Sequence, residues 1–358
     1  MQFSIETNKK IFAEIVDRQI ALISALGYDM IYHKALEIIR ESCIDDKLRV
    51  VVLGYYGCGK SSFLNALFGL VLLPMKLLSF DLIWEVHYSD TATVTLFPKN
   101  GAKRPFNISF DDLGNYLSES IEEYNNNKCI LYKKIVINYP IELRYKEMVF
   151  LDIPGNFEAK NILNDISTED SIIYCMNAGR AFSAFDKTVI ENLRAFGYNS
   201  IIFVLTFYDN LEINDELLGS NDAELTRKYY TEILAKYTDL GSNGIFFVGS
   251  LQMLKGKKNG DNEILKSYDM PRFNKVLEQI LYRKERRKLI DAIISIKKIN
   301  NEVAQRLSNH LDVHISQILK DNSFQWSEIE DQLKLSKDLF MKNSAISTEF
   351  DEIIYNLA

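Results

Sequence analysis

The sequence predicts an α/β fold: a mostly parallel central sheet flanked by helices, with further helical segments at both ends of the chain. Strand-like and helix-like stretches alternate between residues 48 and 248, as in a parallel sheet that is covered on both faces. A glycine-rich loop at 54–61 joins a buried strand to a helix. From about Pro271 onward, the apolar residues follow helical spacing almost without a break.

Size and composition set the first bounds on function. The chain has 358 residues, enough for about two domains with sizeable cores, and its net charge of −7 argues against a general nucleic-acid binder. The four cysteines are scattered without metal-binding spacing, which favours a reducing cytoplasm; they are Cys43, Cys58, Cys129 and Cys175. We expect neither a signal peptide nor a membrane-spanning segment, because no apolar region of the required length occurs.

The expected elements follow from local patterns, taken in chain order. Two helices precede the first strand, at 5–26 and from about 29 to 42. Strands are predicted at 48–53, 82–88, 91–97, 134–139, 146–151, 171–177, 200–205 and 245–248. Helices are predicted at 61–68, from a cap at Ser109 to about 124, at 185–196 and at about 222–237. The polar turn Ser89-Asp90 predicts that the strands at 82–88 and 91–97 form a hairpin.

The C-terminal part of the chain has the pattern of a long bundle or coiled-coil helix. Its apolar residues alternate in steps of three and four, interrupted at Asn300; they include Leu289, Ile293, Ile296, Val303 and Leu307. A further amphipathic stretch covers about 326–340. The basic run at 283–288 fits either a lipid- or partner-binding surface or a solvated helix face, and the sequence leaves both open.

The glycine-rich loop is the strongest functional signal. Gly54, Gly59, Lys60 and Ser61 fit the pattern G-x-x-x-x-G-K-S between a buried strand and a helix. Glycines let backbone N–H groups approach phosphate oxygens, and the helix N-terminus adds about half a positive charge. We therefore expect Lys60 to contact the β- and γ-phosphates of a nucleotide and the Ser61 hydroxyl to bind Mg²⁺.

Two further strand ends complete the candidate site. Asp152 ends an apolar strand and suits Mg²⁺, through a metal-bound water, while the N–H of Gly155 suits the γ-phosphate. Alone, D-x-P-G is also a common turn. Asp209 in Thr206-Phe207-Tyr208-Asp209 is able to accept two hydrogen bonds from guanine, each worth about 1.5–3 kcal/mol, although this segment also suits a simple cap or turn.

Together these residues resemble the dynamin family of large GTPases, particularly its bacterial dynamin-like members. The resemblance covers residues 48–291 and rests on GKSSFLNALFG, Leu72-Leu73-Pro74, the hairpin at 88–97, LDIPG at 151–155, Thr206-x-x-Asp209 and FVGS at 247–250. It implies a GTPase domain at 47–282 and a helical neck built from 1–46 and 283–358, the second of these cut short.

The resemblance implies GTP or GDP and Mg²⁺ as ligands. Nucleotide-binding positions would be Gly54, Gly57, Cys58, Gly59, Lys60, Ser61, Ser62, Gly155, Thr206, Phe207, Asp209, Gly249 and Ser250. Metal ligands would be Ser61 and Asp152, with Asp81 as a further candidate. It also implies a cytoplasmic chain that forms a homodimer or a hetero-oligomer with another dynamin-like chain and associates peripherally with a membrane.

Departures from the family pattern bear on turnover. Tyr56 and Gly57 replace the loop pair Gln-Ser, Phe80 and Asp81 stand at the switch threonines, and Phe207 replaces the base-covering lysine. In the family, the loop pair and the switch threonines are expected to orient the attacking water and close over Mg²⁺, so the catalytic residues are unassigned here. The sequence thus leaves three hypotheses: a dynamin-like GTPase that moves a neck, a weakly or non-hydrolysing partner subunit, and, as the least favoured, an ATPase.

Overall fold

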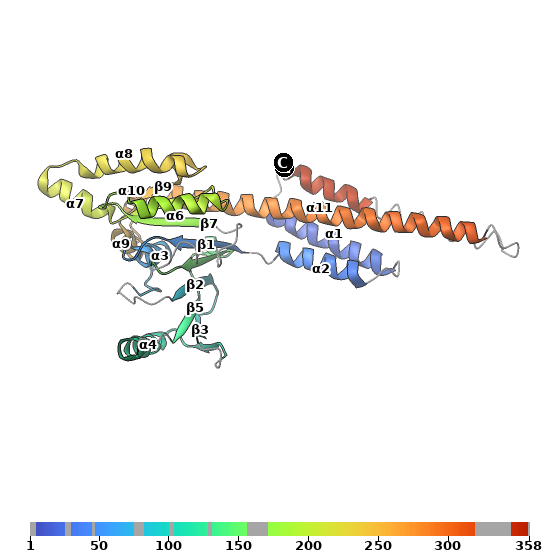
Figure 1. Cartoon of the computed structure of the whole chain (residues 1–358), viewed down its shortest axis with the longest axis horizontal. Helices are drawn as coiled ribbons and strands as arrows, with labels where there is room; N and C mark the ends of the chain where they lie inside the picture. The colour runs from blue at the N-terminus through green and yellow to red at the C-terminus, as the bar shows by residue number, and fades with distance from the viewer. Residues whose placement is uncertain are drawn as a thin grey trace. The chain divides into compact units, whose positions relative to one another are not determined.

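A computed structural model describes residues 5–25, 30–44, 47–74, 82–99, 104–127, 131–155, 171–318 and 345–356 (Figure 1). The contacts within the chain divide it into two compact units. One unit is Lys47–Ile280, and the other combines Met1–Asp46 with Leu281–Ala358. Helix α11 (Met270–Ile318) contributes residues to both.

The unit Lys47–Ile280 contains a nine-stranded sheet in the order β4-β3-β5-β2-β6-β1-β7-β8-β9. The strands are β1 (Leu48–Leu53), β2 (Ile83–Tyr88), β3 (Thr93–Pro98), β4 (Phe106–Ile108), β5 (Tyr132–Tyr139), β6 (Met148–Asp152), β7 (Ser171–Asn177), β8 (Ile202–Thr206) and β9 (Ile245–Phe247). Neighbours from β6 through β1, β7 and β8 to β9 are parallel, as are β2 and β5. The predicted α/β fold with a mostly parallel sheet is confirmed.

Helices cover this sheet and connect its strands. They are α3 (Lys60–Phe68), α4 (Leu113–Asn127), α6 (Ala184–Ala195), α7 (Tyr208–Leu218), α8 (Asp222–Leu234), α9 (Ser250–Asn259) and α10 (Asn262–Ser267), with short 3₁₀ turns at Leu143–Tyr145, Ala235–Tyr237 and Gly241–Gly244. Strands β6 and β8 are buried along their whole length because helices lie on both faces. Their apolar runs supply the core.

The predicted hairpin at 88–97 is wrong. Strand β5 lies between β2 and β3, pairing in parallel with β2 and antiparallel with β3. The connection 89–92 is longer than the two-residue turn that the sequence suggested, because β3 begins at Thr93. Four connecting residues are able to cross two strand spacings of about 4.8 Å each, so the chain reaches past β5.

The predicted cap at Ser109 is also misplaced. The Ser109 hydroxyl accepts a hydrogen bond from the N–H of Asp111 at 3.1 Å, closing a local turn, and α4 begins only at Leu113. Serine side chains favour such turns as readily as helix caps, so the spacing alone did not distinguish them.

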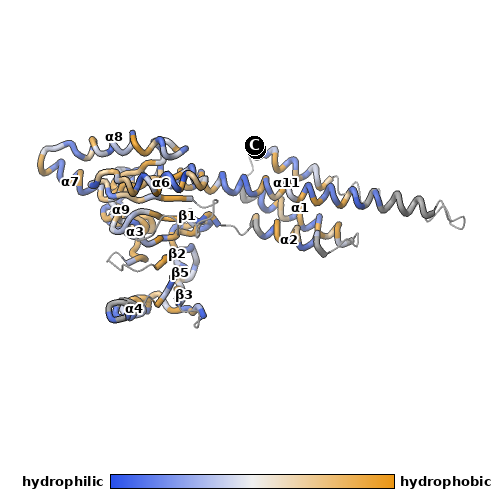
Figure 2. Tube along the Cα trace, viewed as in Figure 1, coloured by the Kyte–Doolittle hydropathy of each residue, from blue (hydrophilic) through white to orange (hydrophobic). Residues whose placement is uncertain are grey.

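The second unit is helical in its described residues. Helices α1 (Ile5–Ala25), α2 (Met30–Ile44), α11 and a helix at 345–356 share one apolar core. Phe12 and Phe350 meet in it with ring centroids 5.9 Å apart. Figure 2 shows the alternation of apolar and polar residues along α1 and α11 that forms this core. The predicted stretch 326–340 lies outside the described residues.

Among the described residues, no helix combines the length and apolar character that a bilayer span requires.

Candidate nucleotide site

The loop at 54–61 connects β1 to α3, and we name it the phosphate loop after its predicted role. Its glycines have positive φ angles, which other residues rarely adopt. Gly54 has φ 143°, and a Cβ there would lie 2.2 Å from the carbonyl oxygen of Cys175 on β7. Gly59, at φ 90°, precedes the first residue of α3. The positive φ angles at both positions, and the lack of room for a Cβ at Gly54, explain why glycine occupies them.

Lys60 is held inside this loop. Its side chain is 8% exposed, and its ammonium donates hydrogen bonds to the carbonyl oxygens of Gly54 at 3.0 Å and Tyr55 at 3.2 Å. The positive charge of Lys60 therefore lies inside the loop that leads into α3. The N-terminus of this helix also favours an anion at the same place.

Ser61 and Asp152 meet beside Lys60. The Ser61 hydroxyl donates to Oδ2 of Asp152 at 2.5 Å. Burial raises the pKa of Asp152, while the charge of Lys60 and the hydrogen bond from Ser61 lower it. A hydroxyl and a carboxylate fit Mg²⁺, a hard cation that takes one or two protein ligands and completes its shell with phosphate and water. Within the described ranges no cluster of three or more His, Cys, Asp or Glu forms, so an all-protein metal cage is not available there.

Gly155 touches the phosphate loop directly. A Cβ at this position would lie 2.3 Å from the backbone nitrogen of Tyr56 and 2.5 Å from the carbonyl carbon of Tyr55. Tyr56 itself is 40% exposed. The segment after β6 is therefore placed against the outer stretch of the loop, where the sequence expected a phosphate contact.

The end of β8 packs against the same loop. The Thr206 hydroxyl lies 2.5 Å from the carbonyl oxygen of Cys58 and 3.0 Å from that of Met176. Phe207 follows with φ 58°, a left-handed conformation uncommon for a bulky residue, and precedes the first residue of α7. A Cβ at Gly59 would lie 3.3 Å from the Phe207 ring, so this ring borders the loop.

Asp209 lies in the first turn of α7, beside the start of α9. Burial raises the pKa of Asp209, whereas the N–H groups of Asp209 and Asn210 and the charge of Lys255 lower it. A Cβ at Gly249 would lie 2.7 Å from Cβ of Asp209, so the carboxylate stands against bare backbone. The adjacent Ser250 hydroxyl is buried without a hydrogen-bond partner among the described residues.

Most of the predicted residues thus gather at the carboxyl ends of β1, β6 and β8 and the segment after β9. Gly57 is exposed at the tip of the loop, Cys58 is buried beneath it, and Ser62 is half-buried in the first turn of α3. Asp81 lies outside the described residues. The structure therefore brings the phosphate-binding and base-reading candidates into one continuous region, as the strand-end rule for α/β sheets expects.

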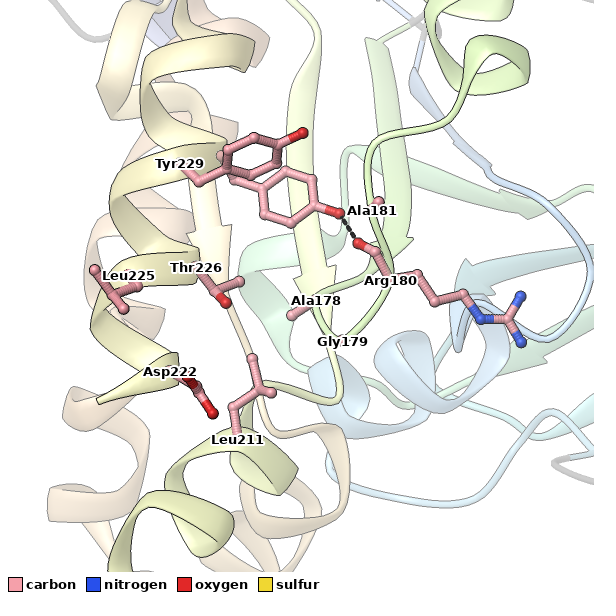
Figure 3. A pocket seen from close by; sticks show the side chains of 10 residues that line it. Ala178, Gly179, Arg180, Ala181, Leu211, Asp222, Leu225, Thr226 and Tyr229 are labelled. Atoms are coloured by element: carbon pink, nitrogen blue, oxygen red, sulfur yellow. Dashed lines mark hydrogen bonds between the residues drawn. The ribbon is translucent and has the colours of Figure 1, made fainter. Parts of the chain in front are cut away.

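One contributor was missed in the sequence. The connection 178–183 between β7 and α6 also reaches the phosphate loop, where the Arg180 guanidinium lies over the Tyr55 ring with its carbon 5.1 Å from the centroid. Behind this connection is a cavity of about 430 Å³, shown in Figure 3. Its lining residues are Ala178, Gly179, Arg180, Ala181, Leu211, Asp222, Leu225, Thr226, Tyr229 and Tyr230. Strand 171–177 was predicted, and the same strand-end reasoning applied to its end would have pointed to Arg180.

The fold and the loop geometry define a P-loop GTPase-type α/β domain with a helical extension. Residues 50–208 match the model of the dynamin family. This segment is a dynamin-family domain, and the resemblance that the motifs indicated is confirmed.

Two curated relatives match this chain, and one of them is described as dynamin-like. A protein described as uncharacterized, in the xynA 3′ region of Caldicellulosiruptor sp. (strain Rt8B.4), is 25% identical over 268 residues, covering 73% of this chain and 63% of that protein. A bacterial dynamin-like protein from Nostoc punctiforme is 23% identical over 333 residues, covering 86% of this chain and 46% of that protein. The chain thus spans about half to two-thirds of the length of these relatives.

A solved structure shares the fold. It is described as an oligomerised bacterial dynamin pair that provides a mechanism for the long-range sensing and tethering of membranes. The match has a TM-score of 0.53 at 18% identity and covers 92% of this chain and 52% of that one. At this identity the likeness establishes the fold alone.

Proposed function

We propose that the unit Lys47–Ile280 binds a guanine nucleotide with Mg²⁺ and hydrolyses the γ-phosphate of GTP. The observation that carries this proposal is the cluster of Lys60, Ser61 and Asp152 at the start of α3, inside a dynamin-family domain. Lys60 supplies positive charge to the β- and γ-phosphates, and Ser61 and Asp152 supply the oxygens for Mg²⁺. The Gly155 N–H is assigned to the γ-phosphate.

Guanine selectivity is assigned to Asp209. Its carboxylate is able to accept the N1–H and the 2-amino hydrogens of guanine, a donor pair that adenine lacks. The absence of a side chain at Gly249 lets its backbone approach Asp209 closely, and the hydroxyl of Ser250, unpartnered among the described residues, is a free donor on the next residue. The Phe207 ring, bordering Gly59, takes the place of the lysine that covers the base, and stacking on a ring contributes about 1–3 kcal/mol per base.

A second candidate function is a weakly or non-hydrolysing subunit that scaffolds or activates another dynamin-like chain. Tyr56 and Gly57, both exposed in the loop, favour it because they replace the Gln and Ser that the dynamin family has at these positions. An ATPase is the third candidate, to be decided by competition between ATP and GTP.

The proposal also includes assembly with another chain and action at a membrane. We infer that nucleotide binding drives dimerisation, as a homodimer or with another dynamin-like chain, and that residues 1–46 and 283–358 act as a helical neck on the GTPase domain at 47–282. The solved bacterial dynamin pair supports assembly and membrane tethering as the process in question. The chain would then act in the cytoplasm and associate peripherally with a membrane.

The test begins with binding. Titration of the chain with fluorescent GDP and a non-hydrolysable GTP analogue in the presence of Mg²⁺ should give saturable binding that ATP does not displace. Lys60→Ala should weaken binding at least tenfold, because a charge-assisted contact to phosphate is lost. Lys187→Ala, which removes an exposed lysine with 55% of its side chain accessible, is the control and should bind normally.

Turnover then separates the two main candidates. Multiple-turnover phosphate release by the isolated chain, on the order of 1 per minute or faster, supports the GTPase and contradicts the passive subunit. Light scattering after size exclusion, with GDP and with the GTP analogue, tests dimerisation. Undetectable nucleotide binding by the wild-type chain, or unchanged binding by Lys60→Ala, overturns the proposal.

A further inference from the structure

Arg180 occupies a defined position on the rim of the phosphate loop. Its guanidinium stacks on the ring of Tyr55, the second residue of that loop, at 5.1 Å from the ring centroid. This distance is within the range of an attractive cation–π contact. Burial raises the pKa of Tyr55, and the positive charge of Arg180 opposes that rise, which agrees with the close approach.

The backbone that carries Arg180 is fixed by its neighbours. The N–H of Ala178 donates to the carbonyl of Thr206 at 2.9 Å, and the N–H of Arg180 donates to that of Asn177 at 3.1 Å. The Tyr230 hydroxyl of α8 donates to the carbonyl of Arg180, the dashed line in Figure 3. The same view shows the Arg180 side chain extending away from the cavity.

The far end of the connection is equally constrained. Ser183 and Asp186 form a capping box at the start of α6. Asp186 is buried and also accepts a hydrogen bond from the Tyr174 hydroxyl of β7 at 2.9 Å. The segment 178–183 is therefore anchored on β7, α6 and α8, so that the guanidinium is presented from a rigid support rather than from a free loop.

The charge of Arg180 is also available. Arg144 and Arg272 in the same unit pair with Glu142 and Asp269, whereas Arg180 forms no ion pair with any residue that the structure describes. An exposed arginine, stacked on a loop side chain and lacking a carboxylate, is suited to an anionic ligand. Guanidinium groups recognise phosphate through paired N–H donors.

The position of Tyr55 indicates which phosphate of a bound nucleotide would lie near the Arg180 guanidinium. Its carbonyl oxygen is 3.2 Å from the Lys60 ammonium, the group assigned to the β- and γ-phosphates, and its peptide touches the segment at Gly155. The base-reading residues Asp209 and Gly249 lie at the other end of the site, at α7 and α9. Tyr55 therefore stands beside the terminal-phosphate end.

We propose that Arg180 binds the terminal phosphate of a nucleoside triphosphate, supplying from the β7–α6 connection the side-chain contact that Tyr56 and Gly57 of the loop do not provide. Tyr55 acts as the platform that orients the guanidinium. This inference rests on the proposed function and deepens it, because it makes Arg180 the residue that distinguishes the triphosphate from the diphosphate.

The test is a comparison of two ligands in one set of variants. With Mg²⁺ present, Arg180→Ala should weaken binding of the non-hydrolysable GTP analogue by about tenfold to a hundredfold and change GDP binding by less than about threefold. Arg180→Lys should fall between Arg180→Ala and wild type, because it keeps the charge and loses the paired donors. Tyr55→Leu should resemble Arg180→Ala in selectivity, and Tyr55→Phe should resemble wild type.

The controls make the outcomes distinguishable. Lys187→Ala removes one exposed positive charge from α6, the helix that follows the connection carrying Arg180, and should leave the ratio of the two affinities unchanged. Retained GDP affinity shows that Arg180→Ala is folded. An unchanged affinity ratio in Arg180→Ala, or an equal loss for both ligands, overturns the inference while leaving the proposed function intact. Absence of any nucleotide binding by the wild-type chain overturns the proposed function and this inference with it.

Discussion

Gly155 is the residue at which the end of β6 meets the phosphate loop. Its nearest neighbours are backbone atoms of Tyr55 and Tyr56, which have no freedom to rotate away as a side chain would. The constraint is therefore steric at a single position, independent of any ligand. It also explains why the D-x-P-G pattern occurs here with glycine in its last place.

Gly155→Ala should disrupt the loop. A methyl group 2.3 Å from the nitrogen of Tyr56 forces a backbone shift, so we expect a loss of about 1–3 kcal/mol in unfolding free energy and at least tenfold weaker nucleotide binding. Gly114→Ala in α4 is the matched control, because its Cβ would meet no atom within 4 Å. Urea unfolding and nucleotide titration measure both effects. Equal behaviour of the two variants would contradict the steric explanation.

For single residues, the sequence predicted those whose position follows from a short pattern beside a strand or helix end. Lys60 and Ser61 follow from an eight-residue pattern between strand and helix, and Asp152 follows from its place at a strand end. The left-handed backbone of Phe207 and the stacking of Arg180 on Tyr55 were not predictable. The stacking depends on β7 lying beside β1 in the sheet, and residues far apart in the chain carry no local signal of that arrangement.

Strand neighbours were the weakest part of the prediction at the level of elements. Apolar patterns predicted eight of the nine strands and missed the short strand β4, and β5 lies between β2 and β3, where a hairpin was expected. Helix α7 was missed because its apolar residues are not consistently buried: Leu217 and Leu218 are 76% and 78% exposed. Periodicity identifies an element by its buried face, and α7 lacks a clear one.

An ion pair links the two parallel strands β2 and β5. Oε2 of Glu85 is 2.9 Å from the Lys134 ammonium, and its Oε1 is 2.7 Å from Nε2 of His87. The hydrogen bond with His87, followed by that with Lys134, lowers the pKa of Glu85 to about 2. The ionised carboxylate is thus favoured by the folded sheet.

The stability of this pairing should depend on pH. Because the pKa of Glu85 is lower in the folded chain than its ordinary value of 4.5, its contribution is complete above pH 4.5 and disappears as the pH falls toward about 2. Glu85→Gln should cost about 1 kcal/mol at pH 7, after allowance for solvent screening, and less at pH 3.

Urea unfolding at the two pH values measures the difference. Glu191→Gln on α6 serves as the control, because that exposed carboxylate has only a 3.8 Å contact with Lys187 and should matter little at either pH. A penalty for Glu85→Gln that is the same at pH 7 and pH 3 would show that the carboxylate charge is not responsible.

For the molecule as a whole, helix α11 connects the nucleotide site to the helical unit along the chain. Near its start, the Phe273 ring packs edge-to-face on Phe63 of α3 at 5.5 Å and on Phe246 of β9 at 5.2 Å. Helix α3 carries Lys60 and Ser61 at its N-terminus. We therefore expect a displacement of α3 on nucleotide binding to act on the first turns of α11, whose later residues belong to the second unit.

We expect Phe273→Leu to separate nucleotide binding from its effect on α11. Leucine keeps the site apolar but loses the edge-to-face ring contacts, so affinity should remain within about threefold of wild type. Hydrogen exchange in wild type should slow on nucleotide binding both at 270–280 and beyond Leu281, whereas in the variant the second response should be lost. Phe203→Leu, a fully buried ring on β8 that packs on Tyr174, controls for general loosening of the core.

The predicted coupling runs through the contact between the Phe63 and Phe273 rings, and this distinguishes it from simple stabilisation by ligand. Nucleotide at 100 times its dissociation constant stabilises the binding unit by about 2.7 kcal/mol by mass action alone, and every core variant that still binds should retain that protection. We expect only the exchange response beyond Leu281 to require the contact of Phe273 with α3. If Phe273→Leu and Phe203→Leu both retain the nucleotide response beyond Leu281, the signal does not pass through this contact, and movement of a helical neck would need another route.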